Sequence, residues 1–375
     1  MPALSMLIKP VSGNCNLRCK YCFYYDVASN RDCFSYGKMS LETLENLIKK
    51  ALEYAQGSCT FAFQGGEPTL AGIEFYEKAV ELQKKYNIRN IRINNSIQTN
   101  GTLLNDDWAK FLKNHNFLVG VSLDGTRKYH DEMRGDAQGN GTFTKVMEGI
   151  RLLQKYKVDF NILCVVNNFV AQGARQIYNF FAKYDFEYIQ PIPCLDPLGE
   201  QTGGQSYSLS PENYSYFLKT FFDMWYEELN AGKVRVVRIF DNYLSILMGY
   251  QPEMCSMGGS CICQSVVEAD GSVYPCDFYV LDEWKLGNIN EKNFEQLIDG
   301  RLSHDFIEIS QKMDRSCKKC EWKWLCRGGC RRSRENFQDR NTLKRNDYCQ
   351  AYKEFFAYAY PRLEEIKKRL TRGMR

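Results

Sequence analysis

The placement of cysteine is the feature that most constrains this chain. There are 16 Cys among 375 residues, with three inside Cys15–Cys22 and nine inside Cys255–Cys349. Met1–Pro10 carries no signal-peptide pattern, so we expect a cytoplasmic protein whose thiols stay reduced. Clustered thiols in a reducing compartment favour metal sites over disulfides. Only 3 His are present, which favours all-thiolate sites over mixed Cys/His zinc sites.

Composition excludes several other classes of protein. The chain is 44% hydrophobic and 25% charged, which is typical of a folded globular protein rather than a disordered one. No apolar run reaches the roughly eighteen residues of a membrane span, so we expect no membrane partner. A net charge of +4 over this length gives no reason to expect nucleic acid as a partner.

Short apolar runs alternate with amphipathic stretches through the first two-thirds of the chain. The expected strands are Leu4–Ile8, Thr60–Phe63, Ile91–Gln98, Leu118–Leu123, Phe160–Val166 and Tyr188–Ile192. The expected helices are Ser40–Ala55, with Ser40 as N-cap, Ile73–Tyr86, Asp106–Asn114, Phe143–Tyr156 and Arg175–Tyr184. This alternation predicts an α/β fold with a parallel sheet, open or closed. Six strands would make an incomplete version of the eight-stranded barrel.

Glycine-containing turns follow these expected strands one after another. They are Gln64–Pro68, Gln98–Gly101 and Ser122–Gly125, and the Cys15–Cys22 loop follows the first strand. Each alone is an ordinary turn pattern. Since the C-terminal ends of parallel strands share one rim of the sheet, four such stretches together predict a functional site there.

The regular alternation stops near Val234, which suggests three parts. We expect a partial barrel over residues 1–233, a Cys-rich domain over 234–349 and a closing amphipathic helix over 350–375. The polar stretch Gly199–Ser208 is predicted to be a loop.

The first cysteine group reads Cys15-x3-Cys19-x2-Cys22 and has no fourth ligand nearby. A structural zinc ion needs four ligands, so zinc would require one from a distant segment. Three close thiolates suit a [4Fe–4S] cluster that keeps one iron open for another ligand.

This spacing, with Tyr21 before the third Cys, resembles the signature of radical S-adenosylmethionine (SAM) enzymes. The resemblance implies a partial (β/α)6 TIM-like barrel whose open iron binds SAM and whose reduced cluster cleaves it to a 5′-deoxyadenosyl radical. It also implies SAM contacts from Tyr21, Gly65, Gly66, Glu67, Ser122, Arg134 and Leu195. Judged singly, Arg134 is better explained by a surface salt bridge, and Tyr21 and Leu195 by core packing.

The later cysteines supply eight further thiols, enough for two four-ligand sites. Spacing alone does not separate iron–sulfur clusters from zinc. The array resembles the SPASM domain of radical SAM enzymes that modify peptides, which implies two auxiliary [4Fe–4S] clusters and three clusters in total. By that resemblance Cys255, Cys261, Cys276 and Cys330 bind one cluster, and Cys317, Cys320, Cys326 and Cys349 bind the other. The spare residues Cys33, Cys59, Cys164, Cys194 and Cys263 are mostly expected to be small buried hydrophobes.

Over nearly its whole length the chain most resembles the anaerobic sulfatase-maturating enzymes. The stretches that carry the resemblance include Phe61–Leu70 and Asp270–Leu281. It implies oxidation of a Cys or Ser in a Cys/Ser-x-Pro-x-Arg motif of a sulfatase polypeptide to Cα-formylglycine, with electrons leaving through the auxiliary clusters. It further implies a reduced donor of the flavodoxin or ferredoxin type, and Asp277 as the general base. Without the resemblance, we would expect Asp277 to form a turn or a supporting hydrogen bond beside the ligand Cys276.

Two other functions remain open at this stage. Another SPASM maturase would form a thioether or carbon–carbon link in a peptide, and a zinc-bearing binding module would have no catalytic activity. A basic stretch around the last cysteines contains Lys323, Arg327, Arg331, Arg332 and Arg334. It could guide an acidic peptide or an electron donor, but we expect an ordinary solvated face.

Overall fold

The computed structural model describes residues 3–336 and 342–373. The chain divides into two compact units. The first unit contains Met1–Leu123, His130–Asn161 and Ile262–Phe306, and the second contains Asp124–Tyr129, Ile162–Cys261 and Ile307–Arg375. Each unit therefore joins segments that are far apart in the sequence. The boundaries expected near residues 233 and 349 stay predictions.

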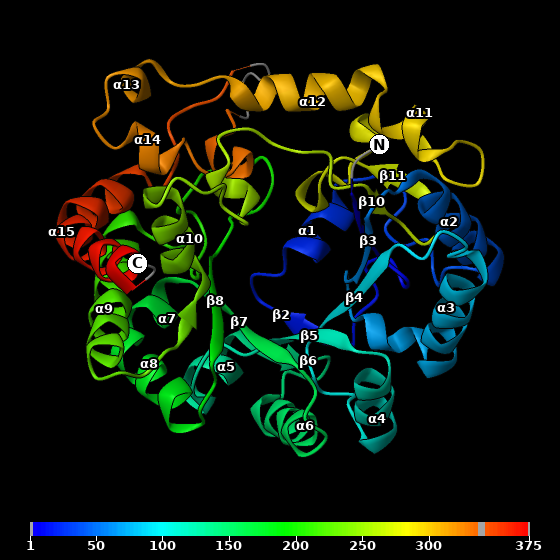
Figure 1. The fold of residues 1–375 in the computed structure, drawn as a ribbon, viewed down its shortest axis with the longest axis horizontal. Coiled ribbons are helices and arrows are strands. Elements are labelled where there is room, and N and C mark those ends of the chain that lie inside the picture. Colours follow the sequence, from blue (N-terminus) through cyan, green and yellow to red (C-terminus); the bar gives the residue numbers. More distant parts are fainter. Residues whose placement is uncertain (1–2, 337–341, 374–375) are drawn as a thin grey trace. The chain divides into compact units, whose positions relative to one another are not determined.

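The first unit is built on a mostly parallel sheet (Figure 1). Its strands are β1 (Leu4–Ile8), β3 (Ser58–Phe63), β4 (Arg92–Thr99), β5 (Phe117–Ser122), β10 (Val266–Val267), β11 (Ser272–Tyr274) and β12 (Gly287–Asn288). The order in this unit is β12-β11-β10-β1-β3-β4-β5. Pairing is parallel from β10 to β5 and antiparallel in β10–β11 and β11–β12. A late segment of the chain thus extends the sheet beside its first strand.

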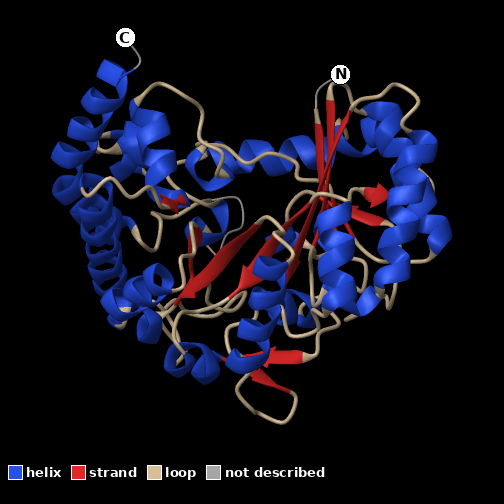
Figure 2. Cartoon of the chain, turned by 60° about the horizontal axis from the view of Figure 1, so that its bottom comes forward, coloured by secondary structure: helices blue, strands red, loops and turns tan. Residues whose placement is uncertain are grey.

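Helices accompany these strands, as Figure 2 shows in blue beside red. The α-helices of the first unit are α1 (Phe23–Ser29), α2 (Leu41–Tyr54), α3 (Ile73–Tyr86), α4 (Asp106–Asn114), α6 (Phe143–Lys155) and α11 (Phe294–Ile298). Short 3-10 helices are η1 (Pro68–Ala71), η3 (Asp277–Tyr279) and η4 (Asp282–Trp284). A small antiparallel pair is formed by β2 (Leu17–Cys19) and β6 (Arg134–Asp136). Helices α5 (Arg127–Met133) and α12 (Arg301–Gln311) contain points where the chain passes from one unit to the other.

The second unit has three parallel strands, β7 (Phe160–Val166), β8 (Tyr188–Pro193) and β9 (Val236–Val237), and it includes β7 from Ile162 onward. Its α-helices are α7 (Asn168–Gln172), α8 (Ala174–Lys183), α9 (Pro211–Asn230), α10 (Arg238–Leu247), α13 (Arg315–Lys318), α14 (Lys323–Cys326) and α15 (Cys349–Gly373). The 3-10 helices are η2 (Cys255–Met257) and η5 (Arg331–Arg334). Long helices α9 and α15 pack against each other through aromatic side chains, among them Phe222 and Phe355 at 5.7 Å between ring centroids.

Local sequence signals explain most of these elements. Ser40 caps α2 as predicted, because its side chain accepts a hydrogen bond from the Thr43 amide. Buried side chains of α2 then recur at helical spacing, among them Leu44, Leu47 and Leu52. The expected strands and helices are all present, with ends within two residues of those predicted, and the closing helix begins at Cys349, one residue before the predicted start. Helix α9 was not predicted, although Ser210 caps it and Pro211 occupies its first turn.

No helix within residues 3–336 and 342–373 is long and apolar enough to cross a membrane.

Candidate active site and cluster sites

The three early cysteines lie on one irregular loop of the first unit. Cys15 precedes β2, Cys19 ends it, and Cys22 is the N-cap residue of α1. The Cys22 amide donates to the Cys19 carbonyl at 3.2 Å, so the loop is tightly turned. Burial raises the pKa of the Cys15 thiol to about 11, and the nearby Glu67 and Cys22 add to the rise. Holding these groups as thiolates requires a positive charge, which the irons of a cluster would supply.

The turn Gly65–Gly66 packs directly against this loop. A Cβ atom on Gly66 would lie 2.1 Å from the carbonyl oxygen of Asn14, the residue before Cys15, and Gly66 has a φ of 55°. A Cβ on Gly65 would lie 2.7 Å from Cε and Cγ of Lys9. Only glycine fits at either position. The two glycines therefore have a structural role, and their contact with SAM stays a prediction.

Glu67 is completely buried and joins the turn to the end of β4. Its Oε1 accepts from the Thr69 amide, from Thr69 Oγ1 at 2.6 Å and from Thr99 Oγ1 at 2.7 Å. Its Oε2 accepts from the Asn100 amide at 2.7 Å. Burial raises the pKa of Glu67, while these hydrogen bonds oppose the rise. Its oxygens therefore organise the loop itself, and a direct role at SAM stays a prediction.

Three more of the predicted SAM residues lie in the first unit. Tyr21 and Arg134 are buried, and the Arg134 guanidinium lies 5.3 Å from the centre of the Tyr21 ring. Arg134 pairs with Cys19 across the β2–β6 ribbon, so it is held beside the cysteine loop. Ser122 ends β5 and accepts a hydrogen bond from Gln98 at 3.2 Å. Leu195 belongs to the second unit, where it lines a small cavity, so its role at SAM stays a prediction.

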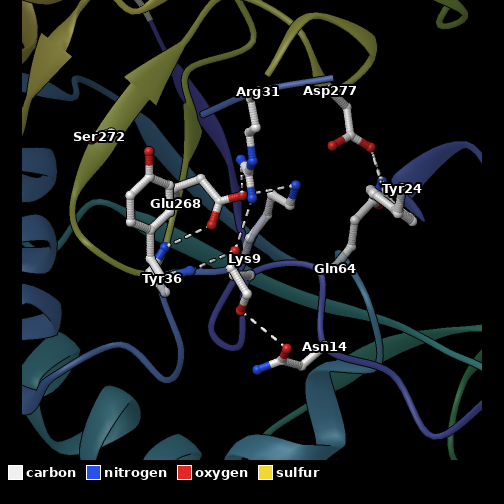
Figure 3. Close-up of polar contacts among 12 residues, drawn as sticks. Lys9, Asn14, Tyr24, Arg31, Tyr36, Gln64, Glu268, Ser272 and Asp277 are labelled. Atoms are coloured by element: carbon white, nitrogen blue, oxygen red, sulfur yellow. Dashed lines mark hydrogen bonds and ion pairs between the residues drawn. The ribbon is translucent and has the colours of Figure 1, made fainter. Parts of the chain in front are cut away.

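Asp277 lies in a buried polar cluster of the first unit (Figure 3). Its Oδ2 accepts hydrogen bonds from the Tyr24 hydroxyl at 2.6 Å and from Gln64 Nε2 at 2.9 Å. Its Oδ1 has no hydrogen-bond partner within the described part of the chain. Burial raises the pKa of Asp277, opposed by Lys9 and by the two hydrogen bonds. The arrangement leaves one buried carboxylate oxygen without a hydrogen-bond partner, so that this oxygen can accept a proton.

A buried ion-pair network lies next to Asp277. Glu268 pairs with Lys9 at 3.0 Å and with Arg31 at 2.8 Å, and all three side chains are at most 2% exposed. Lys9 Nζ also lies 5.2 Å from the centre of the Tyr24 ring. Burial alone would raise the pKa of Glu268, but the two cations outweigh it and lower that pKa to about 2. The network ties the end of β1 to the residue after β10.

Sequence reasoning missed Tyr24 and the three network residues, and it placed Gln64 at the site only as the first residue of the Gln64–Pro68 turn. A signal for two of them was present. Lys9 directly follows the apolar run Leu4–Ile8, and Glu268 directly follows the pair Val266–Val267. A charged residue that continues a buried strand requires a partner of opposite charge.

Four late cysteines come together in the second unit. Cys317, Cys320, Cys326 and Cys349 line one cavity, with Tyr352 and Phe356 on its wall. Burial raises the pKa of the Cys326 thiol to about 11, and the other three thiols raise it further. Four converging thiols fit a fully ligated cluster.

The other predicted ligand set has members in both units: Cys255, Cys261 and Cys330 in the second and Cys276 in the first. Burial raises the pKa of Cys330 to about 12, and the neighbouring Cys255 and Cys261 add to the rise, so these three thiols of the second unit are close. Cys276 belongs to the first unit, and its place in this set stays a prediction. Of the spare cysteines, Cys59, Cys164 and Cys194 are buried as expected, whereas Cys33 and Cys263 are half-buried.

The prediction of a solvated basic face was wrong for three of its five residues. Arg331, Arg332 and Arg334 are 1%, 6% and 3% exposed. Arg334 donates to the Ser310 carbonyl at 2.7 Å and to the Lys312 carbonyl at 3.0 Å, and Arg332 donates to the Asp196 carbonyl. Backbone carbonyl groups thus receive the guanidinium groups of Arg332 and Arg334, whereas Arg331 lies 3.7 Å from the Glu335 carboxylate. Lys323 is exposed and Arg327 is half-buried.

Comparison with known proteins agrees with this arrangement. Residues 10–181 match the radical SAM superfamily, and residues 255–321 match an iron–sulfur cluster-binding (SPASM) domain. A cysteine-type anaerobic sulfatase-maturating enzyme of Clostridium perfringens is 51% identical over 98% of this chain and 99% of its own length. A serine-type enzyme of Bacteroides thetaiotaomicron is 37% identical over 98% of this chain and 92% of its own.

Solved structures of sulfatase-maturating enzymes are also similar to this chain. A structure described as native anSMEcpe with bound AdoMet and Cp18Cys peptide is 50% identical, with a TM-score of 0.93 over 99% of this chain and 100% of that one. The Streptococcus suis protein SuiB, at 15% identity and a TM-score of 0.64 over 93% of this chain and 76% of its own, shares the fold.

Proposed function

Because this chain belongs to the anaerobic sulfatase-maturating enzymes, which are radical SAM enzymes with iron–sulfur clusters, we propose that it oxidises a sulfatase residue to Cα-formylglycine. The substrate is a Cys, and less readily a Ser, in a Cys/Ser-x-Pro-x-Arg segment of the sulfatase polypeptide. The preference for Cys is supported by the 51% identity to cysteine-type relatives, against 37% for a serine-type relative. A peptide substrate is supported by the relative solved with a bound peptide.

We assign the ligand sets as follows. Cys15, Cys19 and Cys22 would hold the first [4Fe–4S] cluster, and Tyr21, Gly65, Gly66, Glu67, Ser122, Arg134 and Leu195 would surround SAM. Cys255, Cys261, Cys276 and Cys330 would hold one auxiliary cluster, and Cys317, Cys320, Cys326 and Cys349 the other. When bound, these groups supply one-electron chemistry: removal of a hydrogen atom from the substrate Cβ and acceptance of the electron that the substrate then loses. A reduced flavodoxin or ferredoxin is the proposed donor, and the proposed location is the cytoplasm.

The observation that carries this proposal is the open oxygen of Asp277. Oδ1 takes the proton of the substrate thiol or hydroxyl, so that C=S or C=O can form as the electron leaves. Tyr24 and Gln64 hold Oδ2 and thereby fix the direction in which Oδ1 points. Burial disfavours the charged carboxylate, which makes Asp277 a stronger base than a solvated aspartate. Water then converts a thioaldehyde product to the aldehyde.

The test is a peptide assay with reconstituted, anaerobically reduced enzyme. Wild type converts a Cys-x-Pro-x-Arg peptide to the aldehyde, whereas Asp277→Asn keeps cleaving SAM and loses aldehyde formation by at least about 100-fold, the range of general-base catalysis. Equal aldehyde formation by both proteins removes Asp277 from this role. SAM cleavage with an unchanged peptide in wild type would instead favour a different peptide maturase.

A further inference from the structure

A broad groove in the second unit lies directly beside the four-thiol set. Its volume is about 670 Å³, and it is lined by Cys320, Glu321, Lys323, Trp324, Arg327 and Met313, among others. Cys320 is one of the proposed cluster ligands, so the groove reaches the ligand shell of that cluster. Trp324 is 45% exposed and presents apolar surface there.

The lining of this groove contains two cations, Lys323 and Arg327, and one carboxylate, Glu321, and the sequence just before it adds further cations. Between Arg315 and Arg327 the sequence has five cations, Arg315, Lys318, Lys319, Lys323 and Arg327, against one carboxylate, Glu321. All of the cations except Arg327 are exposed. Within residues 3–336 and 342–373 none of these five makes an ion pair. Two more cations are exposed near this set: Lys353 lines the cavity of the four thiols, and Arg345 precedes Cys349 closely in the sequence.

We propose that this groove is the docking surface for a small acidic one-electron carrier protein. The exposed Lys323 and Trp324 on the groove, with three more exposed cations close by in the sequence, complement an acidic patch with an apolar centre. Electron-transfer complexes are small and depend on electrostatic steering, which these cations provide. An acidic peptide substrate would not need to lie at a cluster ligand, whereas an electron carrier does.

The inference rests on the proposed function, whose electron balance requires such a partner. Conversion of R–CH2–SH to R–CH=S releases two electrons and two protons. One electron and one proton leave together as the hydrogen atom, and the second proton goes to Asp277. The second electron must pass to an acceptor, and we assign it to the oxidised form of the carrier, which is reduced by one electron.

Binding tests this surface without measuring turnover. The probes are a bacterial flavodoxin and a [2Fe–2S] ferredoxin, both acidic, with the cluster-loaded full chain immobilised under anaerobic conditions. Wild type should bind at least one of them, and its affinity should fall as salt is raised. The variant Lys318→Glu/Lys319→Glu/Lys323→Glu should bind at least about tenfold more weakly, because three attractive charges become repulsive. Its iron content is measured alongside.

A matched variant carries the same change of net charge elsewhere in the second unit. Lys183, Lys233 and Lys368 are exposed, and Lys183→Glu/Lys233→Glu/Lys368→Glu should bind the probe within about twofold of wild type, since nearby charges dominate screened interactions. Equal weakening by both variants, salt-independent binding, or no binding of either probe by wild type would overturn the proposal. So would equally tight binding of a single-stranded oligonucleotide at this groove. Should the groove variant fail to load iron, Lys323→Gln and the salt series on wild type decide the question.

The dithionite-driven peptide assay separates this inference from the proposed function. Aldehyde formation without binding of either carrier would remove the docking surface and leave the proposed function in place. Binding of a carrier without aldehyde formation would remove the proposed function and leave the docking surface in place.

Discussion

The Cys15–Cys22 loop and the four-thiol set of Cys317, Cys320, Cys326 and Cys349 use the same donor atoms in different surroundings. The early loop is irregular and packs against a glycine turn, with Glu67 buried behind it. Three members of the four-thiol set lie on helices, since Cys317 lies in the short helix α13, Cys326 ends the short helix α14 and Cys349 begins the long helix α15. The difference shows how one kind of ligand can serve two proposed tasks: three thiols leave a coordination position for a substrate, and four close it.

The largest expected effect is that a variant in each cysteine set abolishes a different combination of SAM cleavage and aldehyde formation. Cys22→Ala should abolish both SAM cleavage and aldehyde formation, by at least about 100-fold, because even supporting partners of metal ligands can cost that much. Cys320→Ala should keep SAM cleavage and lose aldehyde formation. Each variant should contain about four fewer irons than wild type. High-performance liquid chromatography of 5′-deoxyadenosine and mass spectrometry of the peptide measure the two reactions, and loss of SAM cleavage in both variants would contradict the division of roles.

The next effect concerns stability and compares buried charges in the two units. Glu268→Gln leaves Lys9 and Arg31 buried without their carboxylate and should cost about 3–5 kcal/mol of unfolding free energy. Glu335→Gln should cost much less, because Glu335 lies 3.7 Å from Arg331 and is 12% exposed. Denaturant unfolding of the two variants measures the difference.

The sign of the pH dependence follows from Glu268. Its pKa in the folded protein, about 2, lies below that of an unfolded glutamate. The network's contribution to stability is therefore complete above the unfolded pKa and is lost as pH falls toward 2. Wild type and Glu268→Gln should converge in stability at acid pH, and a constant difference would contradict the ion-pair explanation.

A smaller effect compares the two glycine environments. Gly66→Ala forces a Cβ to within 2.1 Å of the Asn14 carbonyl oxygen, whereas the Cβ of Gly329→Ala meets the Asn346 side-chain amide at 2.5 Å. Both glycines have positive φ, so backbone strain is similar. A side chain can rotate away and a packed backbone cannot, so Gly66→Ala should be the more destabilising by about 1–3 kcal/mol. Thermal unfolding measures the stability of both variants. Equal losses of stability would show that backbone strain, and not the contact of the new Cβ, causes the destabilisation.

The smallest expected effect is a shift in pH dependence. Tyr24→Phe removes the hydrogen bond that favours the charged form of Asp277, so the already raised pKa of Asp277 rises further. Since the base acts only when deprotonated, the acid limb of aldehyde formation should move to higher pH by about one unit. Tyr25→Phe, which changes an exposed ring next to it, serves as control. Identical profiles for the two variants would show that Tyr24 does not tune Asp277.

Much of the first unit was predictable because its signals are local. The periodicity of apolar residues and the helix-capping residue Ser40 predicted elements such as β1, α2 and α3. The spacing of the cysteines predicted the early cluster loop without knowledge of the fold. Helix α9 was missed because its aromatic side chains bury much of its surface and weaken the amphipathic pattern. The arginines near Cys330 were assigned to the surface because charge alone does not reveal the carbonyl groups that receive them.

The sequence by itself determined the family, and it predicted the cluster ligands and the chemistry, since thiol spacing and glycine turns are properties of short segments. Only the tertiary structure brought Tyr24, Gln64 and Asp277 within hydrogen-bond distance, and only it paired Lys9 and Arg31 with Glu268. These contacts join residues more than 200 positions apart, in a sheet where β10 lies beside β1. Strand pairing over such a separation depends on the packing of the whole unit, and no local pattern encodes it.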